Sequence, residues 1–163
     1  MLLTMDVGNT NITFGVFEGD NLSLVSRLAT ERNRTEDQYA LEFIDIFRMY
    51  ALTAAELDGA IISSVVPEIT NSIKNAMVKI AGVTPLVLAP GIKTGLNILI
   101  DDPAELGADL AAGAVGAVAR YPLPAFVVDL GTATKIYVVD EIPKDIGKIQ
   151  FKYLREKREK ANE

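Results

Sequence analysis

The chain has 163 residues and a mass of 17.6 kDa, with 49% hydrophobic and 23% charged residues, values typical of a folded globular domain. Its net charge of −6 argues against nucleic acid and against an anionic membrane surface as partners. Because the sequence has no cysteine and no histidine, disulfides, thiolate metal sites and imidazole catalysis are excluded, and any catalysis must use carboxylates, hydroxyls, backbone amides, lysine or arginine.

The N-terminal residues do not resemble a targeting signal. They include no basic side chain, and Asp6 interrupts the apolar run too early for a signal peptide. The small-residue stretch 111–119 is far shorter than the roughly 20 residues that a bilayer span needs. We therefore expect a soluble, cytoplasmic protein without a membrane partner.

Apolar runs, turn residues and helix caps define the expected elements of the first half. Residues 2–7 and 11–17 flank a Gly-Asn-Thr turn and predict a hairpin. The other expected elements, in chain order, are a strand at 22–29, a helix after Thr35, a buried strand at 59–66, a helix from Pro67 to Gly82 and a short strand at 84–88.

The second half predicts one helix and then a second hairpin. Residues 102–105, Asp-Pro-Ala-Glu, are typical of a helix start, and the small-residue helix is expected to continue to about Arg120. Residues 125–129 and 135–140 predict the hairpin. Three antiparallel strands followed by strand–helix alternation indicate an α/β fold with a mixed sheet flanked by helices.

The C-terminal tail differs in composition from the rest of the chain. Residues 141–163 carry 7 Lys and Arg against 5 Asp and Glu, whereas residues 1–140 carry 9 against 17. Ile149, Tyr153 and Leu154 form a thin apolar stripe, which predicts a basic surface helix over 148–162. A docked helix and a solvated, frayed end both fit this pattern.

The two expected hairpins share a pattern that bears on function. Asp6–Asn11 and Asp129–Thr134 both follow an apolar strand with Asp, an apolar residue, Gly and then small hydroxyl or amide residues. Such an Asp can hold a hydrated Mg²⁺, the glycine admits a phosphate, and the polar residues donate hydrogen bonds to anionic oxygens. One copy is also typical of an ordinary hairpin, but two copies 123 residues apart indicate duplicated phosphate-binding turns.

Duplicated phosphate hairpins resemble the actin, sugar-kinase and heat-shock ATPase superfamily, which implies a ribonuclease-H-like lobe. Within it, residues 1 to about 140 resemble type III pantothenate kinase. The resemblance rests on five ordered segments: Asp6–Asn11, Ile62–Pro67, Pro90–Gly95, Gly107–Asp109 and Asp129–Thr134. It implies an ATP-dependent phosphotransferase that phosphorylates pantothenate, the first step of coenzyme A biosynthesis.

The resemblance also implies roles for particular residues. Asp109 would be the general base for the pantothenate hydroxyl, although an Asp in the first turn of a helix is also favoured by the helix dipole alone. Asp6 would serve Mg²⁺, and Asp129 would hold a monovalent cation, K⁺ or NH₄⁺. The nucleotide would contact Asp6, Val7, Gly8, Asn9, Thr10, Asn11, Ile12, Thr13 and Thr132, and the pantothenate pocket would be lined by Gly107, Ala108, Asp109 and Leu110.

Four positions depart from the family pattern. Leu110 stands where the family has Arg, Ile100 where it usually has Tyr, Gly113 where it has Asn, and Lys135 where it has Thr. Without the guanidinium, the carboxylate of pantothenate lacks a bidentate partner, so we expect turnover to be absent or very low. Family members also continue well past the second hairpin, which implies a truncated kinase.

Two functional classes follow from these features. The first is a pantothenate kinase impaired by truncation and pocket changes; the alternative is a non-catalytic or engineered single-lobe domain that self-associates and at most binds nucleotide weakly. We expect a homodimer with Leu110, Ile100 and helix 111–119 at a dry contact, and the alternative is a monomer in which residues 148–160 cap the exposed face. The expected domains are a first lobe at 1–122, the start of a second lobe at 123–140 and the basic helix at 141–163.

Overall fold

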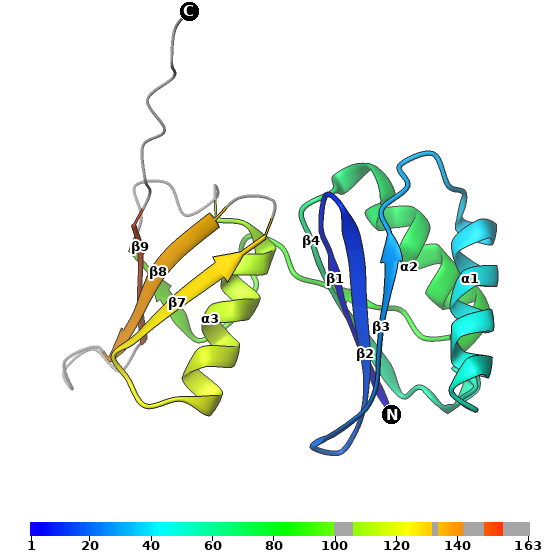
Figure 1. Ribbon diagram of the computed structural model, residues 1–163, viewed down its shortest axis with the longest axis horizontal. Coiled ribbons are helices and arrows are strands. Elements are labelled where there is room, and N and C mark those ends of the chain that lie inside the picture. Colours follow the sequence, from blue (N-terminus) through cyan, green and yellow to red (C-terminus); the bar gives the residue numbers. More distant parts are fainter. Residues whose placement is uncertain (100–105, 132–133, 142–148, 155–163) are drawn as a thin grey trace, which may run out of the picture. The chain divides into compact units, whose positions relative to one another are not determined.

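The computed structural model describes residues 1–99, 106–131, 134–141 and 149–154 (Figure 1). The chain divides into two compact units, Met1–Ala89 and Pro90–Glu163, which are described separately. This division differs from the predicted one after residue 122, because the small-residue helix packs with the second hairpin. No helix in the described residues is long and apolar enough to cross a membrane.

The first unit is a five-stranded mixed sheet with the strand order β3-β2-β1-β4-β5. The pairs β1–β2 and β2–β3 are antiparallel, and β1–β4 and β4–β5 are parallel. This confirms the α/β class and the mixed sheet. The elements are β1 (Leu2–Val7), β2 (Asn11–Glu18), β3 (Asn21–Ala29), α1 (Glu36–Met49), a 3₁₀ turn η1 (Ala54–Glu56), β4 (Gly59–Ser64), α2 (Pro67–Ala81) and β5 (Leu86–Val87).

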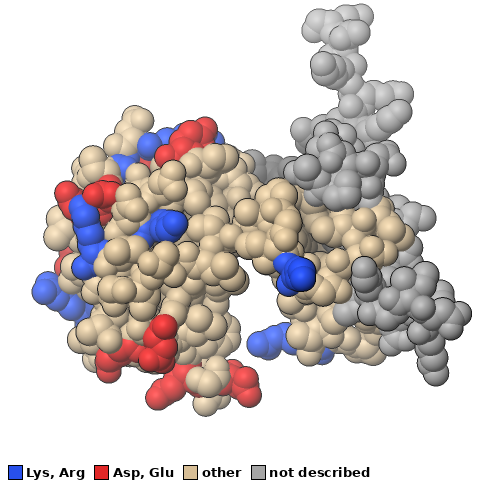
Figure 2. Space-filling view, turned by 180° about the vertical axis from the view of Figure 1, so that it is seen from behind, with Lys and Arg blue, Asp and Glu red and all other residues tan. Residues whose placement is uncertain are grey.

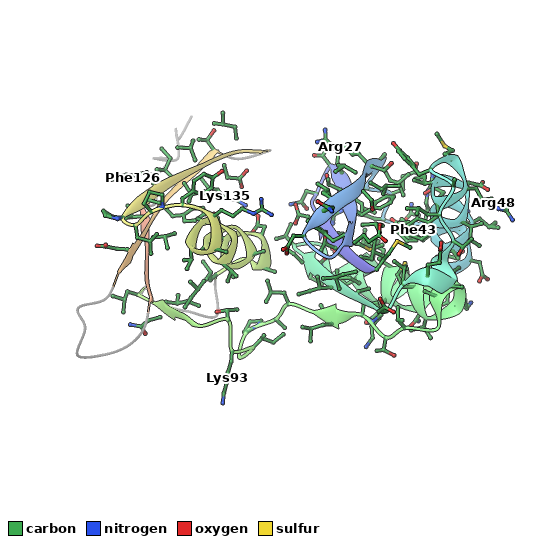
Figure 3. All side chains as sticks on the ribbon, turned by 90° about the horizontal axis from the view of Figure 1, so that it is seen from below. Arg27, Phe43, Arg48, Lys93, Phe126 and Lys135 are labelled. Carbon is green, nitrogen blue, oxygen red and sulfur yellow. The ribbon has the colours of Figure 1, made fainter. Side chains whose placement is uncertain are left out.

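One face of this sheet packs against α1 and α2 (Figure 1). Strand residues alternate between faces, so that Leu3, Met5 and Val7 of β1 are buried while Asp6 is exposed. The rings of Phe14 in β2 and Phe43 in α1 meet edge to face with centroids 5.5 Å apart, and Figure 3 shows Phe43 between the helix and the sheet. The core therefore lies on the helix side and leaves Asp6 on the other face.

The ends of both helices follow the capping residues expected from the sequence. Thr35 and Gln38 form a reciprocal capping box at the start of α1. Gly82 ends α2 in a left-handed conformation with φ of 69°. Ion pairs between Lys79 of α2 and Glu36 and Asp37 of α1 hold the two helices together at their surface, and Figure 2 shows acidic and basic side chains interspersed over this unit.

The second unit is a four-stranded sheet with α3 (Ala108–Arg120) on one face (Figure 1). The strand order is β6-β9-β8-β7, with β7 and β8 forming the expected second hairpin. Its core contains Leu110, Ala114 and Ala117 of α3 and Tyr137 and Val139 of β8. The strands are β6 (Leu96–Ile98), β7 (Ala125–Leu130), β8 (Thr134–Glu141) and β9 (Ile149–Leu154).

Two predictions for this unit differ from the structure. The predicted tail helix is wrong over Ile149–Leu154, which forms β9 between β6 and β8; residues 155–163 lie outside the described residues. Backbone hydrogen bonding to two strand edges outweighs the weak helical pattern of the tail. The predicted helix start at Asp102 also lies outside the described residues, but α3 begins only at Ala108, after the non-helical Leu106 and Gly107.

Candidate functional site

The turn between β1 and β2 is held in one shape by backbone and side-chain hydrogen bonds. The Gly8 N–H donates to Asn11 O at 2.9 Å, and a Cβ at Gly8 would lie 3.2 Å from the same oxygen. At the end of β3, the Thr30 hydroxyl donates to Gly8 O at 2.7 Å and the Thr30 N–H donates to Thr10 O at 2.9 Å. The turn is therefore preorganised, with exposed Asn9 and Thr10 at its tip.

Arg32 brings a positive charge to this turn. Its Nη2 donates to Asn9 Oδ1 at 2.9 Å, and its Nη1 donates to Glu68 Oε1 at 3.0 Å in the first turn of α2. The Arg32 side chain is 51% exposed. A guanidinium at a preorganised Asn-Thr turn is a suitable partner for an anionic oxygen.

Asp6 belongs to a polar row on the sheet face away from the helices. In the strand register Asp6 lies opposite Ser63 of β4 and Thr13 of β2, and Thr13 lies opposite Arg27 of β3. Ser63 is 8% exposed and donates through Oγ to Asp6 Oδ1 at 3.2 Å. Figure 3 shows Arg27 on the side of the sheet away from Phe43 and α1. The row combines a carboxylate, two hydroxyls and a guanidinium on one surface.

The donor set at Asp6 fits a magnesium ion. Asp6 is exposed at the carboxyl end of β1, beside the preorganised turn. Mg²⁺ commonly takes only one or two protein carboxylates and fills its other positions with water and phosphate oxygens. The part of the chain that the structure describes has no group of three or more carboxylates that could enclose a metal ion. Asp6 could therefore hold Mg²⁺ only together with an anionic ligand and water.

A second charged cluster lies in the other unit and joins α3 to the second hairpin. Lys135 of β8 lies opposite Asp129 of β7 in the register, and its Nζ is 3.6 Å from Asp129 Oδ2. The same ammonium donates to Asp109 Oδ2 in the first turn of α3, while the Leu110 N–H donates to Asp109 Oδ1 at 2.8 Å. Figure 3 shows Lys135 between the sheet and α3. Both carboxylate oxygens of Asp109 are therefore engaged.

The ionisation of Lys135 and Tyr137 follows from this arrangement. Burial acts to lower the pKa of Lys135, but the hydrogen bond and charge of Asp109 and the charge of Asp129 outweigh it, so the pKa is raised and the ammonium stays protonated. Burial, followed by the charges of Asp129 and Asp109, raises the pKa of Tyr137 to about 12. The cluster thus contains two carboxylates, one ammonium and one neutral phenol.

Leu110 and Gly113, two of the four positions that depart from the family pattern, lie beneath this cluster. This differs from their predicted location at a dimer contact. Leu110 is only 7% exposed and packs with Ala114, Tyr137 and Val139 in the core of its own unit, so its expected place at an exposed dimer contact is wrong. Gly113 is required for the packing of α3 on β8, since a Cβ there would overlap the Tyr137 hydroxyl. Ile100, which was also expected at the dimer contact, lies outside the described residues.

The residues predicted for a pantothenate pocket are thus only partly brought together. Gly107 caps α3, Ala108 is its first residue, and Asp109 points to Lys135. Leu110 faces the core instead of a pocket. Thr132, predicted to contact the nucleotide, lies outside the described residues.

The predicted monovalent cation does not fit the second cluster. A cation at Asp129 would lie close to the Lys135 ammonium. The Lys135 Nζ is 3.6 Å from Asp129 Oδ2 and forms an ion pair with Asp109 Oδ2. Like charges at such spacing repel strongly in a partly buried site. The side chains of Lys135 and Asp109 are 25% and 19% exposed and that of Asp129 is 43% exposed, so solvent screens this repulsion only in part.

Sequence reasoning missed several residues that shape the first site. Ser63 lies within the segment Ile62–Pro67, which resembles the family without an assigned role, and only the β1–β4 register shows that it contacts Asp6. Arg27 of β3 joins the polar row opposite Thr13, and Thr30, just after β3, donates to Gly8 O of the turn. No local signal indicates Arg32, whose contacts are 23 and 36 residues away along the chain.

Comparisons with known proteins agree with these motifs. The sequence model of type III pantothenate kinase matches residues 2–147. A type III pantothenate kinase from Halalkalibacterium halodurans is 46% identical over 141 residues, 86% of this chain and 56% of the relative. Those from Bifidobacterium animalis subsp. lactis and Listeria welshimeri are each 43% identical, and the chain covers 56% and 55% of them.

A solved structure of the Aquifex aeolicus Ppx/GppA phosphatase matches with a TM-score of 0.43 at 14% identity, covering 85% of this chain and 47% of that one. The chain spans about half the length of the curated relatives it matches. With most of its residues matched by one sequence model and relatives above 40% identity, the chain belongs to the type III pantothenate kinase family.

Proposed function

We propose that the chain is an ATP-dependent phosphotransferase of the pantothenate kinase type in which the turn between β1 and β2 binds the ATP phosphates. The observation that carries the proposal is the preorganised Gly8–Thr10 turn beside Asp6, in a chain of this family. The strand order β3-β2-β1-β4-β5 supports the further proposal that the first unit is a ribonuclease-H-like lobe of the actin type. Because ATP is a cytoplasmic co-substrate, the proposal places the chain in the cytoplasm.

In this proposal the first unit positions the nucleotide. Asp6 and the turn residues Gly8, Asn9 and Thr10 cradle the phosphates, with Arg32 holding Asn9 in place. Val7 and Ile12, also predicted to contact the nucleotide, are fully buried in the core of the first unit, which corrects that prediction. Asp6, oriented by Ser63, would hold Mg²⁺. The magnesium ion supplies neutralisation of the phosphate charge, which is a major requirement of phosphoryl transfer.

Asp109 is the residue we propose as general base, and its surroundings limit it. Its Oδ2 accepts a hydrogen bond from the Lys135 ammonium and its Oδ1 accepts one from the Leu110 N–H. To take a proton from a pantothenate hydroxyl, Oδ2 would have to exchange its bond with Lys135 for one with the substrate. The apolar Leu110 offers no partner to the carboxylate of pantothenate. Low turnover follows from both features.

The pair between Asp109 and Lys135 favours a second candidate function, nucleotide binding without turnover. A coupled assay of ADP release with and without pantothenate, alongside calorimetry with Mg²⁺–ATP, separates the two. ADP release that depends on pantothenate supports the kinase, and ATP binding without such release supports the second candidate. Absence of ATP binding contradicts both, and phosphopantothenate formation at about 0.1 per second or faster, within the ordinary range of enzymes, contradicts the expected low turnover.

A second copy of the chain is the partner that we propose for the second unit. β7 lies at the edge of its sheet and exposes Phe126, Val128 and Leu130, by 71%, 55% and 79%, with 41%-exposed Ile136 opposite Val128. Such a continuous apolar strand face favours a two-fold contact in which each copy covers the other.

Light scattering across a dilution series tests this partner. A mass of 17.6 kDa at every concentration would rule out the dimer. Phe126→Asp should shift the equilibrium to monomer, whereas Leu41→Asp, at a 63%-exposed position on α1, should not.

A further inference from the structure

We propose that Lys135 is a built-in cation: its ammonium takes the position of a monovalent cation between the Asp109 and Asp129 carboxylates, so that the second unit neither binds nor requires K⁺ or NH₄⁺. The inference rests on the proposed function only in that these carboxylates belong to the proposed site. It deepens that function by naming which ion the site uses. That cation is the ammonium group of Lys135, which belongs to the chain itself.

The geometry gives the ammonium two carboxylates from two different elements. Asp129 lies directly opposite Lys135 in the β7–β8 register, and Asp109 reaches the same ammonium from the first turn of α3. The Nζ–Oδ2 distance to Asp129 is 3.6 Å, and Asp109 Oδ2 accepts a direct hydrogen bond. An alkylammonium head carries the same single charge as K⁺ and donates hydrogen bonds as NH₄⁺ does. It therefore meets the electrostatic requirement of the two carboxylates.

The packing beneath the cluster fixes the spacing between the carboxylates. Tyr137, 2% exposed, lies under α3 on the same face of β8 as Lys135. Gly113 allows α3 to approach this ring, because any Cβ there would overlap the Tyr137 hydroxyl. The Leu110 N–H holds the other oxygen of Asp109 at 2.8 Å. Asp109 is thereby oriented toward Lys135 by its own helix.

A tethered ammonium also outcompetes a free ion at ordinary concentrations. Lys135 is part of the hairpin, so its local concentration at the carboxylates is that of an intramolecular ligand, whereas a free ion must be captured from solution. Asp109, Asp129 and Tyr137 are the described titratable groups that face Lys135 from α3, β7 and β8. Their summed charge with Lys135 is −1, which is too little to retain a second cation against the repulsion of the ammonium.

The Leu110 amide, bonded to Asp109 Oδ1, provides a direct readout by NMR. The full chain is titrated with KCl or NH₄Cl against choline chloride at constant ionic strength, without ATP or pantothenate. In the wild type this signal should not respond to K⁺ or NH₄⁺ beyond the choline control. In Lys135→Thr, which empties the space between the carboxylates, the signal should shift saturably, with K⁺ binding at least about tenfold tighter than to the wild type. Lys93→Thr, which removes an exposed lysine of the same unit, should behave as the wild type.

Two results would overturn the proposal: a saturable K⁺ response in the wild type, or a folded Lys135→Thr that responds to K⁺ no more than to choline. If Lys135→Thr does not fold in choline chloride, thermal unfolding in KCl tests instead whether K⁺ restores the folded state. Recovery of the folded state by KCl but not by choline chloride supports the proposal, and no recovery by either contradicts it. Since the titration contains no nucleotide, its failure is distinct from a failure to bind ATP.

Discussion

The contact between Gly113 and Tyr137 predicts a specific coupling between two substitutions. In Gly113→Ala the added Cβ would come closer to the Tyr137 hydroxyl oxygen than the 3.0 Å that Cβ atoms essentially never go below. Tyr137 is 2% exposed, so its ring has little open space to turn into, and the ring, α3 or β8 must shift. Overpacking of this kind typically costs about 1–3 kcal/mol, and we expect Gly113→Ala to lower the stability of the second unit by that amount.

The same geometry predicts that Tyr137→Phe relieves the cost. Once the hydroxyl is removed, the nearest described ring atom to the new Cβ is Cζ at 3.6 Å, an ordinary van der Waals contact. In the Tyr137→Phe background, Gly113→Ala should therefore cost less than about 1 kcal/mol, which gives a coupling energy within the usual range for residues in contact.

Hydrogen exchange of the α3 amides measures this coupling, because it reports the opening free energy of the second unit separately from the first. Wild type, both single variants and the double variant complete the cycle. Additive effects, with Gly113→Ala equally costly in both backgrounds, would refute the proposed packing of α3 on β8.

Three further predictions concern the first unit. Phe43→Ala removes a fully buried ring that meets Phe14 edge to face, so the free energy of unfolding should fall by about 3–5 kcal/mol in a denaturant titration; a loss below about 1 kcal/mol would contradict the core assignment. Thr35→Ala removes one half of the capping box of α1 and should cost about 1 kcal/mol in the same measurement, with no cost as the opposing result. The hydrogen bond from Lys79, followed by that from Asn75, lowers the pKa of the partly exposed Glu36 below its ordinary value of 4.5. The pair therefore stabilises the protein above that pH, and its contribution is lost as the pH falls through the lowered pKa. Lys79→Met should raise the pKa of Glu36 toward 4.5 in an NMR titration of its carboxyl carbon, and an unchanged value would show that the pair does not form in solution.

Local signals account for the elements that the sequence predicted well. The Thr35–Gln38 capping box and the left-handed Gly82 act within one turn of the helix that they limit, so they can be recognised without the fold. The same holds for the hairpin turn at Gly8, where donor and acceptor are three residues apart.

Elements that depend on distant pairing were predicted less well. β9 forms because β6 and β8 offer it two hydrogen-bonding edges, and residues 149–154 alone do not show this. The sequence predicted that α3 starts at Asp102, because residues 102–105 match a capping signature. In the structure Gly107 caps the helix.

The candidate site shows the same division between local and distant contacts. Asp6, Gly8 and Asp129 could be named from the repeated turn pattern alone. Lys135 drew attention only as a departure from the family, because its partner Asp109 is 26 residues away in the chain. Its role as a charge partner needs the approach of α3 to β8, which in turn depends on Gly113.

The central claim, that Asp6 and the adjacent turn bind Mg²⁺–ATP, is tested most directly by calorimetry of ATP binding with and without Mg²⁺. Asp20→Asn, at an exposed position in the β2–β3 turn, is the matched control for the loss of one negative charge. The wild type and Asp20→Asn should bind ATP in a Mg²⁺-dependent manner, and Asp6→Asn should lose this dependence with at least about a tenfold fall in affinity in the presence of Mg²⁺. Unchanged Mg²⁺-dependent ATP binding by Asp6→Asn would contradict the account.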